Sequence, residues 1–173
     1  MAADIKTKYA ATSSVALTCV LTSLASDTNL LAGRASTAVD NTTNVDLDHL
    51  LSGVITTGTS PTVSTTIEVW VYSYHIITTG TPTYPDSITG TDANKSMTST
   101  NVKNSALLRA ATLTVDNTTA RGYYFAPISI AALFGGTMPP FWGVYVVHNT
   151  GVALNSTAGN HVIHYERVLA QSV

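Results

Sequence analysis

The run from 65 to 77, TTIEVWVYSYHII, constrains the fold of this chain more than any other feature. It is rich in β-branched and aromatic residues, a composition typical of a β-strand. Further strand-like runs, each bounded by turn residues, lie at 14–24, 44–56, 123–126, 141–148 and 161–169. One short helix is expected at 128–134, and 105–115 fits either a strand or a short helix. We therefore predict an all-β fold, an antiparallel β-sandwich that is jelly-roll-like, with at most one short helix.

No linker or change in composition divides the chain. We expect a single β-sandwich domain at 14–173, preceded by an extended N-terminal arm at 1–13. The large apolar side chains of this arm are Ile5 and Tyr9, with lysines between them. Terminal segments are ordinarily disordered unless something holds them. We therefore predict that the arm lies across a neighbouring subunit, anchored by Ile5 and Tyr9, and that the protein is a dimer or trimer.

The surface chemistry limits the kinds of partner. Charged residues are 10% of the chain and the formal net charge is -2, whereas roughly a quarter of an average domain is charged. Without a basic stripe we expect no nucleic acid, and without a run of roughly 18 apolar residues we expect no membrane span. Polar residues interrupt the apolar run at 15–24, so we expect no secretory signal, a reducing cytoplasm and a small buried Cys19. Abundant hydroxyl side chains suit contact with another protein, because little charge must be desolvated.

The pentapeptide VDNTT occurs twice, at 39–43 and 115–119. Asp and Asn side chains form Asx turns by accepting a hydrogen bond from the backbone two residues ahead. Each copy lies between two predicted strands. We interpret the repeat as the same structural turn at equivalent corners of two Greek keys, and keep a ligand site as the alternative.

No residue pattern indicates catalysis or a cofactor. The sequence has no G-x-S-x-G motif. Asp46 and Asp48 share a face of the 44–56 run, and we expect a solvated strand face there. His148 and His161 flank a predicted closing hairpin and could lie opposite each other, but two ligands fall short of the three or four that zinc requires. We therefore predict no enzyme activity, no metal site and no cofactor.

The aromatic residues offer a choice between binding and packing. Trp70, Tyr72 and Tyr74 share one face of the 65–77 strand. Exposed, they would suit carbohydrate stacking; packed, they would form a core or an interface with a subunit. We treat Ile5, Tyr9 and these three aromatic residues as candidate interface residues.

Four stretches are more specific than composition: LLAGRASTAVDNTTN, TTGTSPTVSTTIEVWVYSY, NVKNSALLRAA and YYFAPISIAALFGGTMPPFWGVYVVHNTGVALN followed by GNH. Together they resemble a group of small jelly-roll proteins encoded among the virion genes of tailed bacteriophages. The resemblance implies a capsid decoration or cement protein on the surface of the virion, assembled in the host cytoplasm. It implies the major capsid protein and further copies of the chain as partners, and it assigns no catalytic or binding residue. A tail- or connector-associated virion protein and a carbohydrate-binding β-sandwich module are the alternatives.

Overall fold

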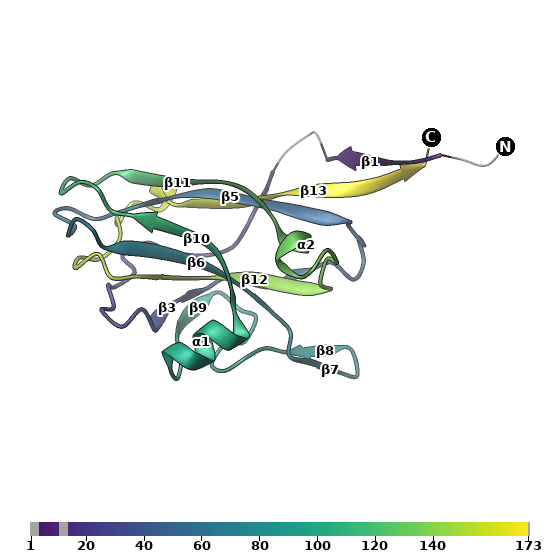
Figure 1. Ribbon diagram of the computed structural model, residues 1–173, viewed down its shortest axis with the longest axis horizontal. Helices are drawn as coiled ribbons and strands as arrows, with labels where there is room; N and C mark the ends of the chain where they lie inside the picture. Colours follow the sequence, from purple (N-terminus) through teal and green to yellow (C-terminus); the bar gives the residue numbers. More distant parts are fainter. Residues whose placement is uncertain (1–3, 11–13, 173) are drawn as a thin grey trace.

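The computed structural model describes residues 4–10 and 14–172, and most of their strands form two antiparallel sheets packed face to face (Figure 1). The first sheet has the order β1-β13-β5-β11, with β2 also paired to β13. Its strands are β1 (Ile5–Tyr9), β2 (Val15–Ala16), β5 (Asp48–Thr56), β11 (Gly122–Ser129) and β13 (Val162–Ser172). The second has the order β10-β6-β12-β3-β9, with β4 also paired to β12. Its strands are β3 (Ala32–Ala35), β4 (Val39–Asp40), β6 (Thr66–Ser73), β9 (Ala93–Ser96), β10 (Leu108–Thr114) and β12 (Phe141–His148).

The strand pairs are nested as in a long hairpin that has been rolled up. β6 pairs with β10, and β5 pairs with β11. β3 and β4 pair with β12, and β2 pairs with β13. This nested order across two sheets is the jelly roll. The all-β, antiparallel, jelly-roll-like prediction is confirmed.

The described residues contain two short α-helices, where at most one was expected. α1 (Thr100–Ala106) begins after Ser99, whose side chain accepts a hydrogen bond from the Val102 backbone, and β10 follows it directly. The ambiguous segment at 105–115 therefore contains the end of a helix and a strand. α2 (Ile130–Leu133) is a single turn in the region where the sequence predicts a helix, and Ala158–Asn160 form a 3₁₀ turn.

Strand β6 is buried on both faces, because the outer face of the second sheet is covered by α1 and the segment before it. Ile67, Val69 and Val71 point into the core between the sheets. Trp70 and Tyr72 point outward but are buried in a second cluster with Met97 and Leu107 among others. Trp70 and Tyr72 are therefore packed, as the packing alternative predicts, but within the chain and not at an interface with a subunit. These two residues do not form the exposed aromatic stripe that carbohydrate stacking needs.

Tyr72 and Trp70 are also fixed by polar contacts. The Tyr72 hydroxyl donates to the Ser36 carbonyl at 2.7 Å, and the Trp70 indole donates to Glu68 at 2.8 Å. Gly143 of β12 lies opposite Tyr72, and a Cβ at Gly143 would overlap the tyrosine ring. The small residue therefore leaves the space that the ring occupies.

Both VDNTT copies form Asx turns at corners where the chain crosses from the second sheet to the first. In the first copy Asp40 accepts from the Thr42 backbone at 2.8 Å. In the second copy Asn117 accepts from the Thr119 backbone at 2.8 Å. The turn is therefore one residue later in the second copy. The prediction of a structural turn is confirmed, but the two corners are not superimposable copies.

The N-terminal arm pairs with its own chain. β1 is antiparallel to the last part of β13, from Ile5 opposite Ser172 to Tyr9 opposite Val168. β13 extends beyond Val168, which lies opposite Asp48, the first residue of β5, so residues 169–172 have no partner on the β5 side. β1 pairs with them on the other side. The prediction that the arm lies across a neighbouring subunit is therefore wrong for 5–9; residues 1–3 and 11–13 lie outside the described part. Ile5 and Tyr9 nonetheless stay exposed.

Candidate functional site

One end of the sandwich carries a group of exposed large apolar side chains. At this end β5 and β12 begin and β6 and β13 end. Two ribbons project from it: the β1–β13 ribbon, and the hairpin of β7 (Ile76–Thr78) with β8 (Thr81–Thr83) (Figure 1). We call the following set the apolar end: Ile5, Tyr9, Val45, Leu47, Tyr74, Ile76 and Ile77. It contains Ile5, Tyr9 and Tyr74 of the predicted interface residues, and the other members were not singled out by sequence.

Both faces of the β7–β8 hairpin are partly open to solvent. Ile76 and Ile77 are consecutive in the strand and so point to opposite faces, yet they are 52% and 38% exposed. The turn residues Thr79 and Gly80 both have positive φ, 49° and 80°, as in the two-residue turns that match the twist of a hairpin. Isolated two-stranded hairpins are marginally stable in water. Both isoleucines are therefore available to a partner.

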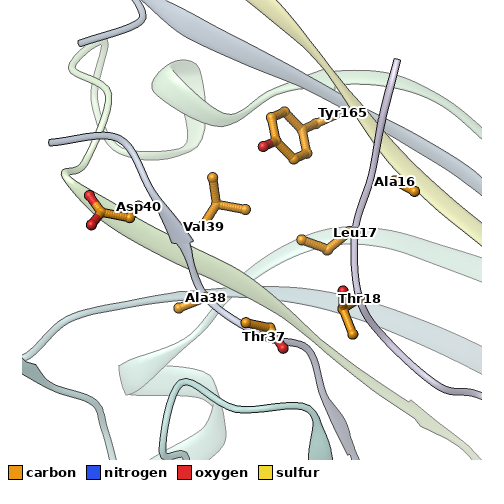
Figure 2. A pocket seen from close by; sticks show the side chains of 8 residues that line it. All are labelled: Ala16, Leu17, Thr18, Thr37, Ala38, Val39, Asp40 and Tyr165. Atoms are coloured by element: carbon orange, nitrogen blue, oxygen red, sulfur yellow. The ribbon is translucent and has the colours of Figure 1, made fainter. Parts of the chain in front are cut away.

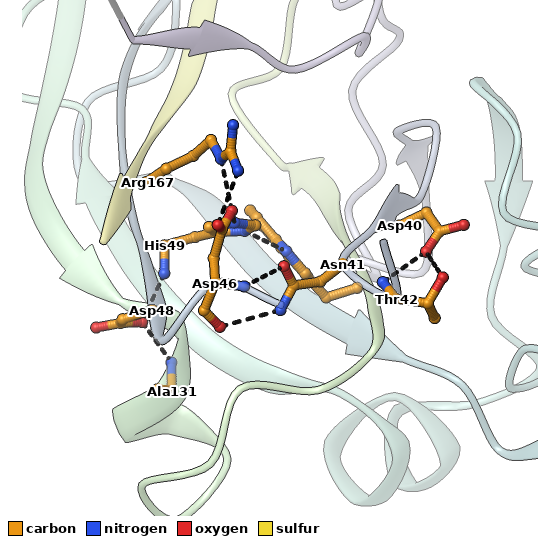
Figure 3. A network of polar contacts seen from close by, with 9 residues as sticks. Asp40, Asn41, Thr42, Asp46, Asp48, His49, Ala131 and Arg167 are labelled. Carbon is orange, nitrogen blue, oxygen red and sulfur yellow. Dashed lines mark hydrogen bonds and ion pairs between the residues drawn. The ribbon is translucent and has the colours of Figure 1, made fainter. Parts of the chain in front are cut away.

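The loop between β4 and β5 presents Val45 and Leu47 of the apolar end. The Asn41 side chain brackets the Asp46 backbone, accepting from its N–H at 2.9 Å and donating to its carbonyl at 3.1 Å (Figure 3). The Leu47 N–H donates to the Val168 carbonyl at 2.8 Å. Val45 has φ of 51° and is 71% exposed. A β-branched residue with a positive φ has a strained backbone. The loop therefore presents the apolar side chain of Val45 to solvent at an energetic cost.

A buried polar network anchors this loop to both sheets (Figure 3). The Arg167 guanidinium donates to both Asp46 carboxylate oxygens, at 2.6 and 2.8 Å. His49 Nε2 lies 2.8 Å from Asp46 Oδ2, and the Trp142 indole donates to His49 Nδ1 at 2.9 Å. The network thus connects the loop, β5, β13 and β12. It corrects the prediction that Asp46 and Asp48 lie on a solvated face: Asp46 is buried, and the partly buried Asp48 accepts from the backbone of His49 and Ala131.

The hydrogen bonds of His49 leave it no free nitrogen for catalysis. An indole N–H can only donate, so Nδ1 accepts and Nε2 carries the proton that Asp46 accepts. Burial lowers the pKa of His49, which keeps the ring neutral. Burial alone would raise the pKa of Asp46, but hydrogen bonds from Arg167 and His49 outweigh it and hold the pKa below its usual value. The arrangement is a structural support and offers no base to a substrate.

A second buried ion pair holds α1 on the outer face of the second sheet. Lys103 Nζ lies 3.0 Å from Glu68 and donates to the Leu30 carbonyl at 2.7 Å. The same ammonium lies 4.9 Å from the centroid of the Trp70 ring. Its partners explain why a lysine is buried here. The sequence carries no local signal for this pair, because Glu68 and Lys103 are on elements far apart in the chain.

The histidines at 148 and 161 do not form a pair. His148 is the last residue of β12 in the second sheet, whereas His161 immediately precedes β13 of the first sheet. His148 contacts Thr150 and the Leu24 carbonyl, while His161 contacts the Thr56 N–H and the Asn155 carbonyl. Within the described residues no group of three or more His, Cys, Asp or Glu side chains could hold a metal ion. Cys19 is half-buried against the core, and burial raises the pKa of its thiol.

A hollow of about 200 Å³ lies where the edges of the two sheets meet, between β2 and β4 (Figure 2). Its wall consists of Ala16, Leu17, Thr18, Thr37, Ala38, Val39, Asp40 and Tyr165. Pockets for small molecules usually measure roughly 300–1,000 Å³. Its polar side chains are hydroxyls and one exposed carboxylate, so size and lining both argue against a dedicated ligand site.

No family model, curated protein or solved structure matches this chain. Among the helices of the described part of the chain, none has the length and apolar character that crossing a membrane requires.

Proposed function

We propose that this chain is a non-enzymatic structural protein of a virion, a capsid decoration or cement protein that contacts the major capsid protein. The observation that carries the proposal is the apolar end. Exposed large apolar side chains are usually scattered on a monomer, and their concentration on one region marks an interaction surface. The sequence resemblance to virion proteins of tailed phages supplies the class of partner.

The rigid support beneath the apolar end favours binding to an assembled surface. Asn41, Asp46 and Arg167 fix the loop that presents Val45 and Leu47, so little conformational freedom is lost there when a partner binds. Two ribbons project from opposite sheets at this end, and can therefore contact different subunits of a shell. A protein that bridges two subunits raises the free energy needed to separate them by its own binding free energy.

The buried polar groups give no support to a catalytic function. Each buried side-chain nitrogen or oxygen in the described residues has a hydrogen-bond partner within the protein. Catalytic groups, in contrast, must keep an atom free for the substrate. The contacts of His49, Lys103 and Glu68 hold elements of the fold together.

Co-sedimentation with phage heads assembled without this chain tests the proposal. We expect the protein to pellet with the heads in a fixed stoichiometric ratio. The double variant Ile76→Ser/Ile77→Ser should weaken the association at least tenfold, which corresponds to about 1.4 kcal/mol. Val63→Ser provides a matched control, because Val63 is an exposed apolar residue outside the apolar end.

Three results would contradict the proposal. Full-length protein that stays in the supernatant at every concentration would exclude a decoration role. Equal losses for the double variant and for Val63→Ser would remove the apolar end as the contact. Pelleting with tails but not with heads would place the protein at the tail or connector.

A further inference from the structure

The open edge of β1 has the features of a docking site for an extended segment of another protein. β1 is the outermost strand of its sheet. The Ala10 N–H donates to the Arg167 carbonyl at 2.9 Å. This bond shows which residues of β1 form backbone hydrogen bonds with β13. In an antiparallel pair hydrogen-bonded and non-bonded residues alternate. The backbone N–H and C=O groups of Lys6 and Lys8 therefore form hydrogen bonds with β13. Those of Ile5, Thr7 and Tyr9 point to the open edge.

The two faces of β1 differ in chemistry. Ile5 and Tyr9 lie on one face, 77% and 56% exposed, opposite Ser172 and Val168. Ser172 is too small to cover Ile5. Lys6 and Lys8 lie on the other face, opposite Gln171 and Leu169. Neither lysine forms an ion pair with any residue of the described chain, Asp4 included.

A second copy of the chain is a poor occupant of this edge. Antiparallel pairing of two β1 strands about Thr7 would place Lys6 of one copy directly opposite Lys8 of the other, on both sides of the axis. Like charges in directly opposed positions are destabilising. Lysines on an edge strand are a known protection against such pairing. The same lysines favour a strand with acidic residues at the facing positions.

We propose that β1 accepts an additional strand from another protein, one in which acidic and apolar residues alternate. The backbone of that strand bonds to Ile5, Thr7 and Tyr9, its acidic side chains face Lys6 and Lys8, and its apolar side chains cover Ile5 and Tyr9. Addition of a strand to an open sheet edge is an established mode of peptide recognition. This inference deepens the proposed function, on which it rests for the source of the strand: an exposed segment of the capsid protein.

Synthetic peptides test the inference on the isolated full-length protein. The probes are a peptide of alternating glutamate and valine and a matched peptide of alternating lysine and valine. We expect the acidic peptide to bind at least tenfold more tightly, and its binding to slow hydrogen exchange at Ile5, Thr7 and Tyr9. The double charge reversal Lys6→Glu/Lys8→Glu should invert the preference between the two peptides.

A proline variant separates edge binding from general attraction to lysines. Thr7→Pro removes an N–H that points to the open edge and takes no part in the β1–β13 bonds, and edge strands tolerate such a proline. We expect Thr7→Pro to weaken the binding of the acidic peptide at least tenfold and to leave the fold unchanged. Thr7→Ser is the control that retains the N–H.

Three outcomes would overturn the inference: equal binding of the two peptides, full binding by Thr7→Pro, or a dimer of the free protein that Thr7→Pro abolishes. These measurements need no virus particles. Failure of the chain to pellet with heads would therefore refute the proposed function while leaving the strand-binding result intact, and the reverse combination would refute only the inference.

Discussion

Replacing Arg167 with methionine should reveal how strongly the buried network stabilises the fold. The Arg167→Met variant keeps much of the side-chain packing but removes both hydrogen bonds to Asp46. The Asp46 side chain is 1% exposed, so its carboxylate would remain buried with His49 as its remaining side-chain partner. Removal of one partner from a buried ion pair usually costs about 3–5 kcal/mol. Arg167 is itself 30% exposed, and water can partly replace it, so we expect about 3 kcal/mol.

Equilibrium unfolding in guanidinium chloride measures this change as a shift in midpoint at constant slope. The double variant Asp46→Asn/Arg167→Met distinguishes an unpaired charge from a lost contact. Its neutral amide can still accept the proton of His49 Nε2 without the penalty of a buried charge. We expect it to be more stable than Arg167→Met by about 1 kcal/mol, a coupling typical of residues in direct contact.

The reasoning fails if Arg167→Met lowers the free energy of unfolding by less than about 1 kcal/mol, as for an exposed ion pair. It also fails if the double variant is less stable than Arg167→Met. Either result would mean that the Asp46 carboxylate is hydrated, in contrast to its burial in the structure.

Three further predictions concern stability. Burial lowers the pKa of His49 and His148 below the ordinary 6.5; the unfolded chain therefore binds protons that the native state does not, and stability should fall as the pH drops below about 6.5, by up to about 1.4 kcal/mol per pH unit for each histidine. Urea unfolding at pH 7.5 and 5.5 measures this, and equal stabilities would contradict it. Val45→Asn should raise the free energy of unfolding by about 1 kcal/mol, because asparagine tolerates the left-handed backbone and little apolar burial is lost; unchanged or lower stability in urea would show that the valine is not strained. Gly143→Ala should lower the free energy of unfolding by about 1–3 kcal/mol, because its Cβ would overlap the tyrosine ring that faces it. Urea unfolding measures this against Gly159→Ala, which has open space around it and should be nearly neutral.

Strand identity was predictable from sequence where local composition matches the environment. The predicted strand at 141–148 coincides with β12, which is central in its sheet and buried along its whole length. The predicted strand at 65–77 agrees with the start of β6 at Thr66 but spans two strands, since β6 ends at Ser73 and β7 starts at Ile76. Both parts carry the same β-branched and aromatic residues, so composition could not show that the second leaves the sheet as a hairpin.

The buried network was missed because β5 begins later than the alternation of residues indicates. Alternation from 44 onward assumed a continuous strand, but Val45 has a positive φ and β5 starts only at Asp48. Arg167 gave the one usable signal. It shares strand parity with the buried Ile163, and a charged residue in an inward position indicates a buried partner of opposite charge. The identity of the carboxylate that pairs with Arg167 depends on the pairing of distant strands. No local sequence pattern indicates that pairing.

The rolled-hairpin order of the strands determines when the chain can fold. Of the nested pairs in the two main sheets, β6 with β10 joins the segments that are closest in sequence, and each later pair closes a longer loop. Loop closure costs less once the inner pairs have formed, so pairing should proceed outward, with β13 last. Because β13 is the central partner of β1, β2 and β5, the first sheet cannot be completed until the ribosome has synthesised β13. Until then β1 and β2 have no partner in their sheet, and the nascent chain exposes the unpaired edges at which β-rich proteins aggregate.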